Sequence, residues 1–169
     1  MDPEPLTSKR RTECQSYRGA ILRAMLALAT LLVVTASSHA QAAPTSGDFI
    51  RVEIAGFRND KGQAICALFS SAKDFPKNGD KAIAHAKSGI SRGRAVCEFP
   101  AIAPGRYAVS VFHDENSNGK MDTNFMGIPR EGVGASNNAI GHFGPPKFDA
   151  AAFQYAGGKL DLTITIAYL

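Results

Sequence analysis

The chain has 169 residues, with 19 Lys and Arg, 15 Asp and Glu, and a formal net charge of +4. Five of the basic residues lie near the N-terminus, so the rest of the chain is close to neutral, and its basic residues are scattered among acidic ones. Nucleic acid is bound by a continuous basic stripe, often interleaved with aromatic residues, and the sequence shows neither feature. Composition therefore argues against nucleic acid as a partner.

The N-terminal segment has the three zones of a cleavable secretory signal. A basic stretch comes first, an apolar run over residues 24–34 follows, and small residues close the segment at Ala40 and Ala42. The apolar run is shorter than the roughly 20 residues that span a bilayer. We therefore expect a signal peptide over residues 1–42, one domain over residues 43–169, and a periplasmic or secreted protein. The alternative is an uncleaved leader, which would be the chain's only attachment to a membrane.

Removal of the leader would also remove Cys14 and leave Cys66 and Cys97 as an even pair. Exported proteins occupy oxidising compartments, in which such pairs form disulfides. Because each cysteine lies in a run with a β pattern, we expect a disulfide between neighbouring strands. The alternative is two buried free thiols, since free cysteine packs as a small hydrophobic residue.

Strand patterns begin directly after the leader, and no sustained helical period is present. Residues 49–57 alternate between apolar and polar side chains, and residues 63–69 are almost wholly apolar. The turn residues at 59–62 are expected to join these two strands in a hairpin. Residues 70–80, which are polar and contain Pro76, are expected to form a loop.

The next segment, residues 82–90, is ambiguous between a short helix and a strand. The strand is favoured because a tight turn leads from it into a β-patterned run at residues 94–99, as in a second hairpin. Clear alternation follows at residues 106–113 and at residues 159–168. Short strands joined by Gly and Pro turns indicate an all-β protein, an antiparallel sandwich of two sheets with about seven strands.

The segment over residues 103–138 reads APGRYAVSVFHDENSNGKMDTNFMGIPREGVGASNN. Together with the later FGPPKFD and the Gly-Gly turn before the last strand, it resembles the bacterial secreted family known as domain of unknown function 2141, over residues 49–166. The resemblance implies a transthyretin-like, or prealbumin-like, β-sandwich exported to the periplasm. It implies no established activity.

Oxygen-bearing side chains recur at alternate positions within this segment, as in the first nine positions of an EF-hand calcium loop. The predicted calcium ligands are Asp114, Asn116, Asn118, the carbonyl of Lys120, and Asp122. Calcium prefers about six to eight oxygens, so Glu131, Asn124 or water would have to complete the site. The alternative is a solvated hairpin tip at Asn118-Gly119 that holds no metal.

Residues 123–148 form an unusually long connection, rich in Gly, Pro and Asn. Such connections are often functional, and its side chains form a candidate ligand surface: Arg130, Glu131, Asn137 and Asn138, with the apolar Phe125, Met126, Phe143 and Phe148. The alternative is a packed cover over one open end of the sandwich, with its Phe side chains as plugs.

No catalytic constellation is recognisable in the sequence. His113 lies beside Asp114, and His85 and His142 are further away, but no two histidines have metal-ligand spacing. There is no nucleophile elbow and no phosphate-binding glycine loop. We therefore predict no catalytic residues and a binding or structural module of the cell envelope, whose partner is an envelope protein or a glycan. The alternatives are a small transthyretin-like hydrolase and an accessory subunit that pairs an exposed strand with a larger partner.

Overall fold

The computed structural model describes residues 47–141 and 144–169. They belong to one compact unit, Gln41–Leu169. The predicted signal peptide lies outside the described residues, as do His142 and Phe143. No helix in the described part of the chain is both long and apolar enough to cross a membrane.

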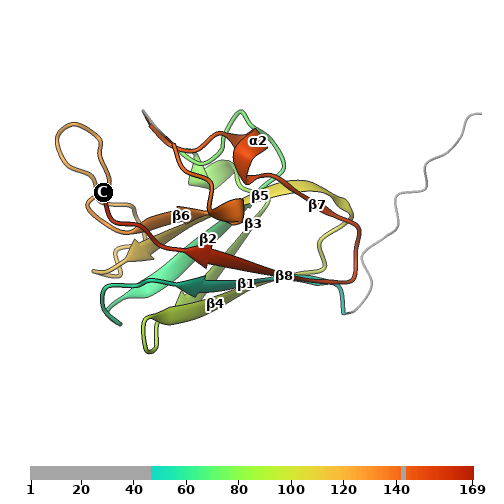
Figure 1. Ribbon diagram of the computed structural model, residues 1–169, viewed down its shortest axis with the longest axis horizontal. Coiled ribbons are helices and arrows are strands. Elements are labelled where there is room, and N and C mark those ends of the chain that lie inside the picture. Colours follow the sequence, from blue (N-terminus) through green and yellow to red (C-terminus); the bar gives the residue numbers. More distant parts are fainter. Residues whose placement is uncertain (1–46, 142–143) are drawn as a thin grey trace, which may run out of the picture. The chain divides into compact units, whose positions relative to one another are not determined.

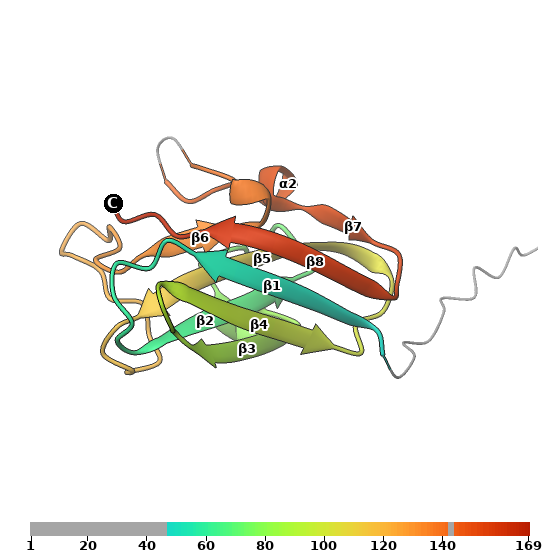
Figure 2. The same cartoon turned by 60° about the horizontal axis from the view of Figure 1, so that its bottom comes forward.

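The described strands form two sheets that face each other (Figures 1 and 2). The first sheet has the order β4 (Arg94–Pro100), β1 (Phe49–Ala55) and β8 (Lys159–Thr165). The second has the order β3 (Ala84–Gly89), β2 (Gln63–Phe69), β5 (Gly105–Asp114) and β6 (Val133–Ala135), and β7 (Phe153–Tyr155) pairs with the start of β5. The described residues also contain three short helical segments: η1 (Gly79–Lys81), η2 (Ser136–Asn138) and α2 (Phe148–Ala151).

The all-β prediction is confirmed, but consecutive strands pair differently from the prediction. β1 and β2 lie in different sheets, so the predicted first hairpin is wrong. The second hairpin is wrong for the same reason: β3 is indeed a strand, but it pairs with β2, whereas β4 pairs with β1. In addition, β1 and β8 are parallel, and the described part of the chain holds eight strands, not about seven in a wholly antiparallel arrangement.

Burial explains why β1 and β2 separate. β1 and β4 alternate between buried and more exposed residues, because only one face of their sheet is covered. β2 is buried at six of its seven positions, because both faces of its sheet are covered. One face of β1 therefore meets solvent, whereas β2 is covered on both sides, and the two strands lie in different sheets. The chain therefore crosses between the sheets at residues 56–62.

Asp60 ties this first crossing to the turn between β3 and β4. Its carboxylate accepts hydrogen bonds from the backbone N–H groups of Gly93, at 2.7 Å, and Arg92, at 2.8 Å. These two bonds outweigh a small effect of burial and hold the pKa of Asp60 below its ordinary value. The turn itself closes through paired bonds between Ser91 and Arg94, at 2.8 and 3.0 Å. A local turn therefore forms where predicted, although its two strands continue into opposite sheets.

The main core lies between the sheets. Ile50, Val52 and Ile54 of β1 pack in one cluster with inward-facing residues of β2 and β5. The predicted disulfide is confirmed: Cys66 of β2 is bonded to Cys97 of β4, with 6.6 Å between their Cα atoms. It joins the two facing sheets through this core, and not neighbouring strands as expected.

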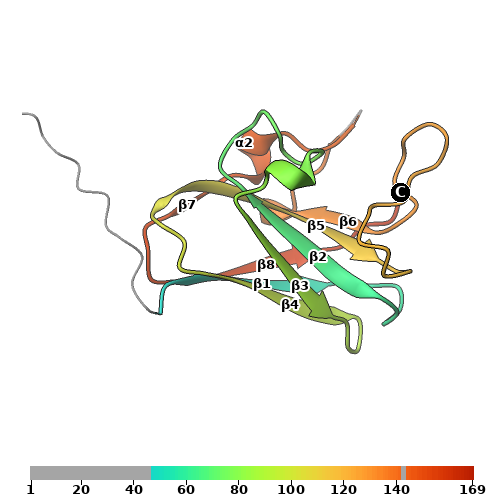
Figure 3. The same cartoon turned by 180° about the vertical axis from the view of Figure 1, so that it is seen from behind.

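A second core covers the outer face of the five-stranded sheet. Phe69 of β2 contacts Phe75, and Phe75 contacts Phe148 of α2, with ring centroids 5.4 and 5.8 Å apart and edge-to-face geometry. In Figure 3, α2 and the β2–β3 connection lie together at the edge of this layer. Phe148 is thus a buried plug, as the cover alternative expects, whereas Phe125 and Met126 are exposed. The predicted long connection also contains β6, which the sequence did not reveal.

Removal of the disulfide should destabilise the sandwich without changing its topology. In the loop-entropy description, a bridge that closes a separation of 31 residues stabilises the fold by about 4 kcal/mol. The unit Gln41–Leu169 carrying both Cys66→Ala and Cys97→Ala should therefore unfold about 10 °C lower than the wild type in thermal denaturation. Reductant should lower the melting temperature of the wild type but not that of the double variant. Two freely titrating thiols in the denatured, unreduced wild type would contradict the bridge.

Candidate functional site

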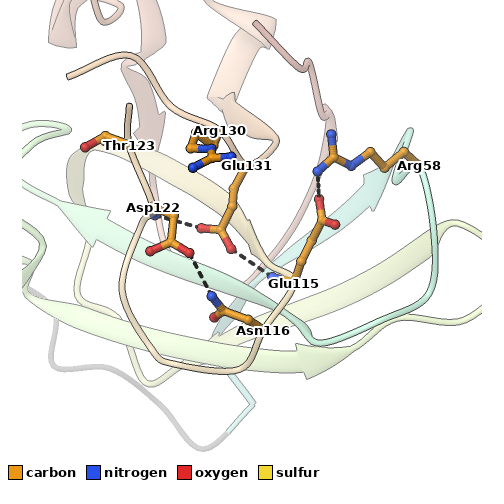
Figure 4. Close-up of a pocket in the computed structure, with 7 residues that line it drawn as sticks. All are labelled: Arg58, Glu115, Asn116, Asp122, Thr123, Arg130 and Glu131. Atoms are coloured by element: carbon orange, nitrogen blue, oxygen red, sulfur yellow. Dashed lines mark hydrogen bonds and ion pairs between the residues drawn. The ribbon is translucent and has the colours of Figure 1, made fainter. Parts of the chain in front are cut away.

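The candidate site lies at the end of the sandwich where β1 and β5 finish. The loops at residues 56–62 and 115–132 meet there around a polar pocket of about 580 Å³ (Figure 4). Its lining consists of Arg58, Glu115, Asn116, Asp122, Thr123, Arg130 and Glu131. Two of the four residues predicted as a ligand surface, Arg130 and Glu131, are therefore brought to it.

Two buried carboxylates shape these loops. Asp114, at the end of β5, is fully buried and accepts bonds from the backbone N–H groups of Asn118 and Gly119, at 3.0 and 2.9 Å, and from the Gln63 side chain, at 2.8 Å. Glu131 is also buried, and its two oxygens accept the N–H groups of Glu115 and Asp122, each at 3.0 Å. A buried carboxylate requires such partners, so the backbone must curl around both groups.

Four of the five predicted calcium ligands, Asp114, Asn116, Asn118 and Asp122, are linked by hydrogen bonds within one loop. Asp122 accepts hydrogen bonds from the side-chain amides of Asn116, at 2.7 Å, and Asn118, at 3.2 Å. The amide oxygen of Asn118 in turn accepts the backbone N–H of Lys120, at 2.7 Å. Gly119, with a φ of 75°, allows the sharp turn between them. Within the described residues, no three His, Cys, Asp or Glu side chains are grouped as a metal site, so a cation here would depend on amide and carbonyl oxygens.

The two protein side chains considered for completing the calcium site differ in position. Glu131 lies beside the loop and bonds to it at Glu115 and Asp122. Asn124 is committed elsewhere, because its side-chain oxygen accepts the N–H groups of Met126 and Ile128, at 2.9 and 3.0 Å. Of the two, Glu131 lies next to the loop, and each of its oxygens already accepts one backbone N–H group.

His113 is fully buried and both its ring nitrogens have partners. Nε2 lies 2.7 Å from the carbonyl oxygen of Lys61, which can only accept, so Nε2 carries a proton. In the neutral ring, Nδ1 then accepts the hydroxyl proton of Tyr168, at 2.7 Å. Tyr168 also accepts the backbone N–H of Arg58, at 3.0 Å. His113 therefore holds the C-terminus and the crossing loop together, and it does not line the pocket.

Arg58 and Glu115 form an ion pair on the pocket wall, with 2.5 Å between their side chains (Figure 4). Burial alone would raise the pKa of Glu115, but hydrogen bonds from Asn59 and Arg58, with the positive charge of Arg58, lower it below the usual value. Burial also raises the pKa of Tyr168, whose ring lies 4.6 Å below the Arg58 guanidinium. The sequence gave no signal for these contacts, because they join residues more than fifty positions apart.

The remaining residues of the predicted ligand surface have other roles. Asn137 donates its side-chain N–H groups to the carbonyls of Ala150 and Ala152, at 3.2 and 3.0 Å. Asn138 accepts the backbone N–H of Thr165 in β8, at 2.8 Å. Both amides therefore fasten η2 to its neighbours. Arg130, in contrast, is exposed, and its guanidinium has no partner among the described residues (Figure 4).

The ion pair of Glu115 should make stability depend on pH. Its pKa in the folded state lies below the value of 4.5 for a free Glu side chain, so the unfolded chain binds more protons. This stabilisation is complete above about pH 4.5 and is lost as the pH falls through the folded pKa. The free energy of unfolding, measured with urea at several pH values between about pH 3 and pH 6, should rise less steeply with pH for Glu115→Gln than for the wild type. Glu98→Gln, which removes a looser pair with Arg51 at 3.7 Å, is the control; equal slopes for wild type and Glu115→Gln would contradict this role.

Comparison with known proteins yields one family match. The family described as "Uncharacterized protein conserved in bacteria (DUF2141)" matches residues 52–163. This span begins in β1 and ends in β8, and it includes all the pocket-lining residues. No curated protein and no solved structure shows a significant match.

Proposed function

The chain belongs to the bacterial family DUF2141, and we propose that it is an exported binding module of the cell envelope. The observation that carries the proposal is an open polar pocket with one unpaired cation, Arg130, on a wall that is otherwise held by internal bonds. Preformed polar groups of this kind recognise a ligand with little reorganisation. The disulfide across the core is consistent with an oxidising compartment and supports export through the predicted leader.

Binding accounts for the site better than hydrolysis. The alternative of a small transthyretin-like hydrolase would need a general base that reaches a substrate. Among the described residues, His113 is the histidine nearest the pocket, but it is buried and both its nitrogens are engaged. The transthyretin-like arrangement itself stays a prediction from the resemblance, supported here by two facing β-sheets.

The pocket lining suggests an acidic glycan as the ligand. A carboxylate or phosphate on the ligand can pair with Arg130, whereas Asn116, Asp122 and Thr123 offer donors and acceptors for hydroxyl groups. Glu115 already pairs with Arg58, so Arg130 is the cation available to the ligand. Of the two partner classes expected from the sequence, this chemistry favours a glycan over a protein.

Calcium is proposed as a stabiliser of the pocket rim. Asp114, Asn116, Asn118 and Asp122 converge in one short loop, and Glu131 lies against it. A cation among these oxygens would replace amide-to-carboxylate bonds with stronger ligation and would fix Asp122, which lines the pocket. With few carboxylates the site would be weak, in the range suited to extracellular calcium.

Calcium should therefore raise the melting temperature of the unit Gln41–Leu169. For a Kd of about 1 mM, calcium at about 10 mM stabilises the folded state by about 1.4 kcal/mol, or about 4 °C. Asp122→Asn should abolish most of the rise, and Asp161→Asn, an exposed change on β8, should leave it intact. A melting temperature that is the same in calcium and in chelator would remove the metal proposal.

Glycan binding should depend on Arg130. Titration calorimetry with glycan strands containing muramic acid, and with chitin oligosaccharides that lack its carboxylate, separates the charge from the sugar backbone. We expect the acidic glycans to bind more tightly than the neutral ones. Arg130→Gln should weaken the binding of the acidic glycans about tenfold and leave the binding of the neutral glycans unchanged. Arg94→Gln, an exposed arginine outside the pocket, is the matched control. Absence of binding, or equal binding by wild type and Arg130→Gln, would contradict the proposal.

A further inference from the structure

A narrow apolar projection extends from the same end of the sandwich. Residues 123–129, here called the finger, project beyond the strand ends next to the C-terminus (Figures 1 and 3). Phe125 is 96% exposed and Met126 is 64% exposed at its tip, and Ile128 is also exposed. Single exposed apolar side chains are normal on a protein surface, but large apolar side chains grouped on one projection indicate an interaction surface.

The backbone of the finger holds these side chains outward. Thr123 and Pro129 form a β-bridge at its base. Asn124 closes the tip, since its N–H donates to the carbonyl of Ile128 and its carbonyl accepts the N–H of Gly127, both at 2.9 Å. Its side-chain oxygen accepts two more N–H groups. The exposure of Phe125 therefore follows from an ordered, internally bonded turn.

Basic side chains flank the finger. Lys120 precedes it and Arg130 follows it, and these are the exposed charged residues of the described segment 115–131. The carboxylates of the same segment already have partners: Glu131 binds backbone N–H groups, Glu115 pairs with Arg58, and Asp122, on the pocket wall, accepts from two amides. An apolar tip between two cations matches the boundary between acyl chains and anionic headgroups of a lipid layer.

We propose that the finger docks the protein on an anionic membrane surface, with Phe125 and Met126 inserted and Lys120 and Arg130 at the phosphate level. A protein partner fits less well, because stable interfaces bury about 800 Å² on each side and draw on about 20 to 30 residues. The finger offers seven. A membrane needs no complementary pocket, and a few apolar and basic residues give weak, reversible attachment. This contact is separate from an uncleaved leader. It shares Arg130 with the glycan proposal, but it is argued from the exposed apolar tip and not from the pocket or from calcium.

The chain contains no tryptophan, so Phe125→Trp introduces a single reporter at the tip. In the unit Gln41–Leu169, its emission should shift to shorter wavelength with phosphatidylglycerol vesicles and should be quenched by brominated acyl chains. Ile83→Trp, at a half-exposed site before β3, is the matched control and should show neither effect. Chelator is present throughout, so that calcium cannot bridge protein and phosphate. An unshifted and unquenched Phe125→Trp would overturn the proposal.

Sedimentation with the same vesicles measures affinity. Wild type should bind phosphatidylglycerol more tightly than phosphatidylcholine, and less tightly as salt is raised. Phe125→Ser combined with Met126→Ser should weaken binding about tenfold or more, Lys120→Gln by a smaller factor, and Ile83→Ser should have no effect. Circular dichroism melts confirm that each variant is folded. Vesicle binding that the double variant retains, or a dimer in solution that the double variant abolishes, would assign the finger to another role.

Discussion

The hydrogen bonds from backbone N–H groups to the buried carboxylates of Asp114 and Glu131 determine the shape of the loops around the pocket. A carboxylate removed from water is tolerated only when its oxygens are hydrogen-bonded, so each group imposes a path on the chain around it. Asp114 curls residues 115–119 over the end of β5. Glu131 joins the two ends of the candidate calcium loop, at Glu115 and Asp122. The pocket wall and the base of the finger both follow from these bonds.

This arrangement needs a rigid support, and the crossings between the sheets supply one. The first crossing is held from two sides: Asp60 binds the β3–β4 turn, and the Lys61 carbonyl accepts from His113. Gly62 is required there, because a Cβ would overlap the Asp114 carbonyl. The same segment carries Arg58, which pairs with Glu115 across the pocket wall. The disulfide between β2 and β4 holds the same two sheets together behind the site.

The sequence predicted the features that depend on residues close to each other along the chain, such as strand positions and loops. Alternation located the main strands, and the spacing of Asp114 to Asp122 marked a loop whose side chains do converge. Strand pairing was not predictable in this way, because the turn from Ser91 to Arg94 closes with paired hydrogen bonds although its two strands belong to different sheets. β6 and β7, with three residues each, are too short to show a period. Contacts such as His113 with Tyr168 join distant positions and leave no local signal.

The calcium loop ends at Asp122 and the finger begins at the next residue, Thr123, so the two proposed binding events are coupled in energy. A cation at the loop would offset the charges of Asp114 and Asp122, which repel an anionic lipid surface, and would stiffen the residue from which the finger starts. Calcium would then strengthen membrane binding. By linkage, the membrane would raise calcium affinity by the same factor. A weak calcium site is therefore consistent with a function at the membrane, where docking compensates for its low affinity in solution.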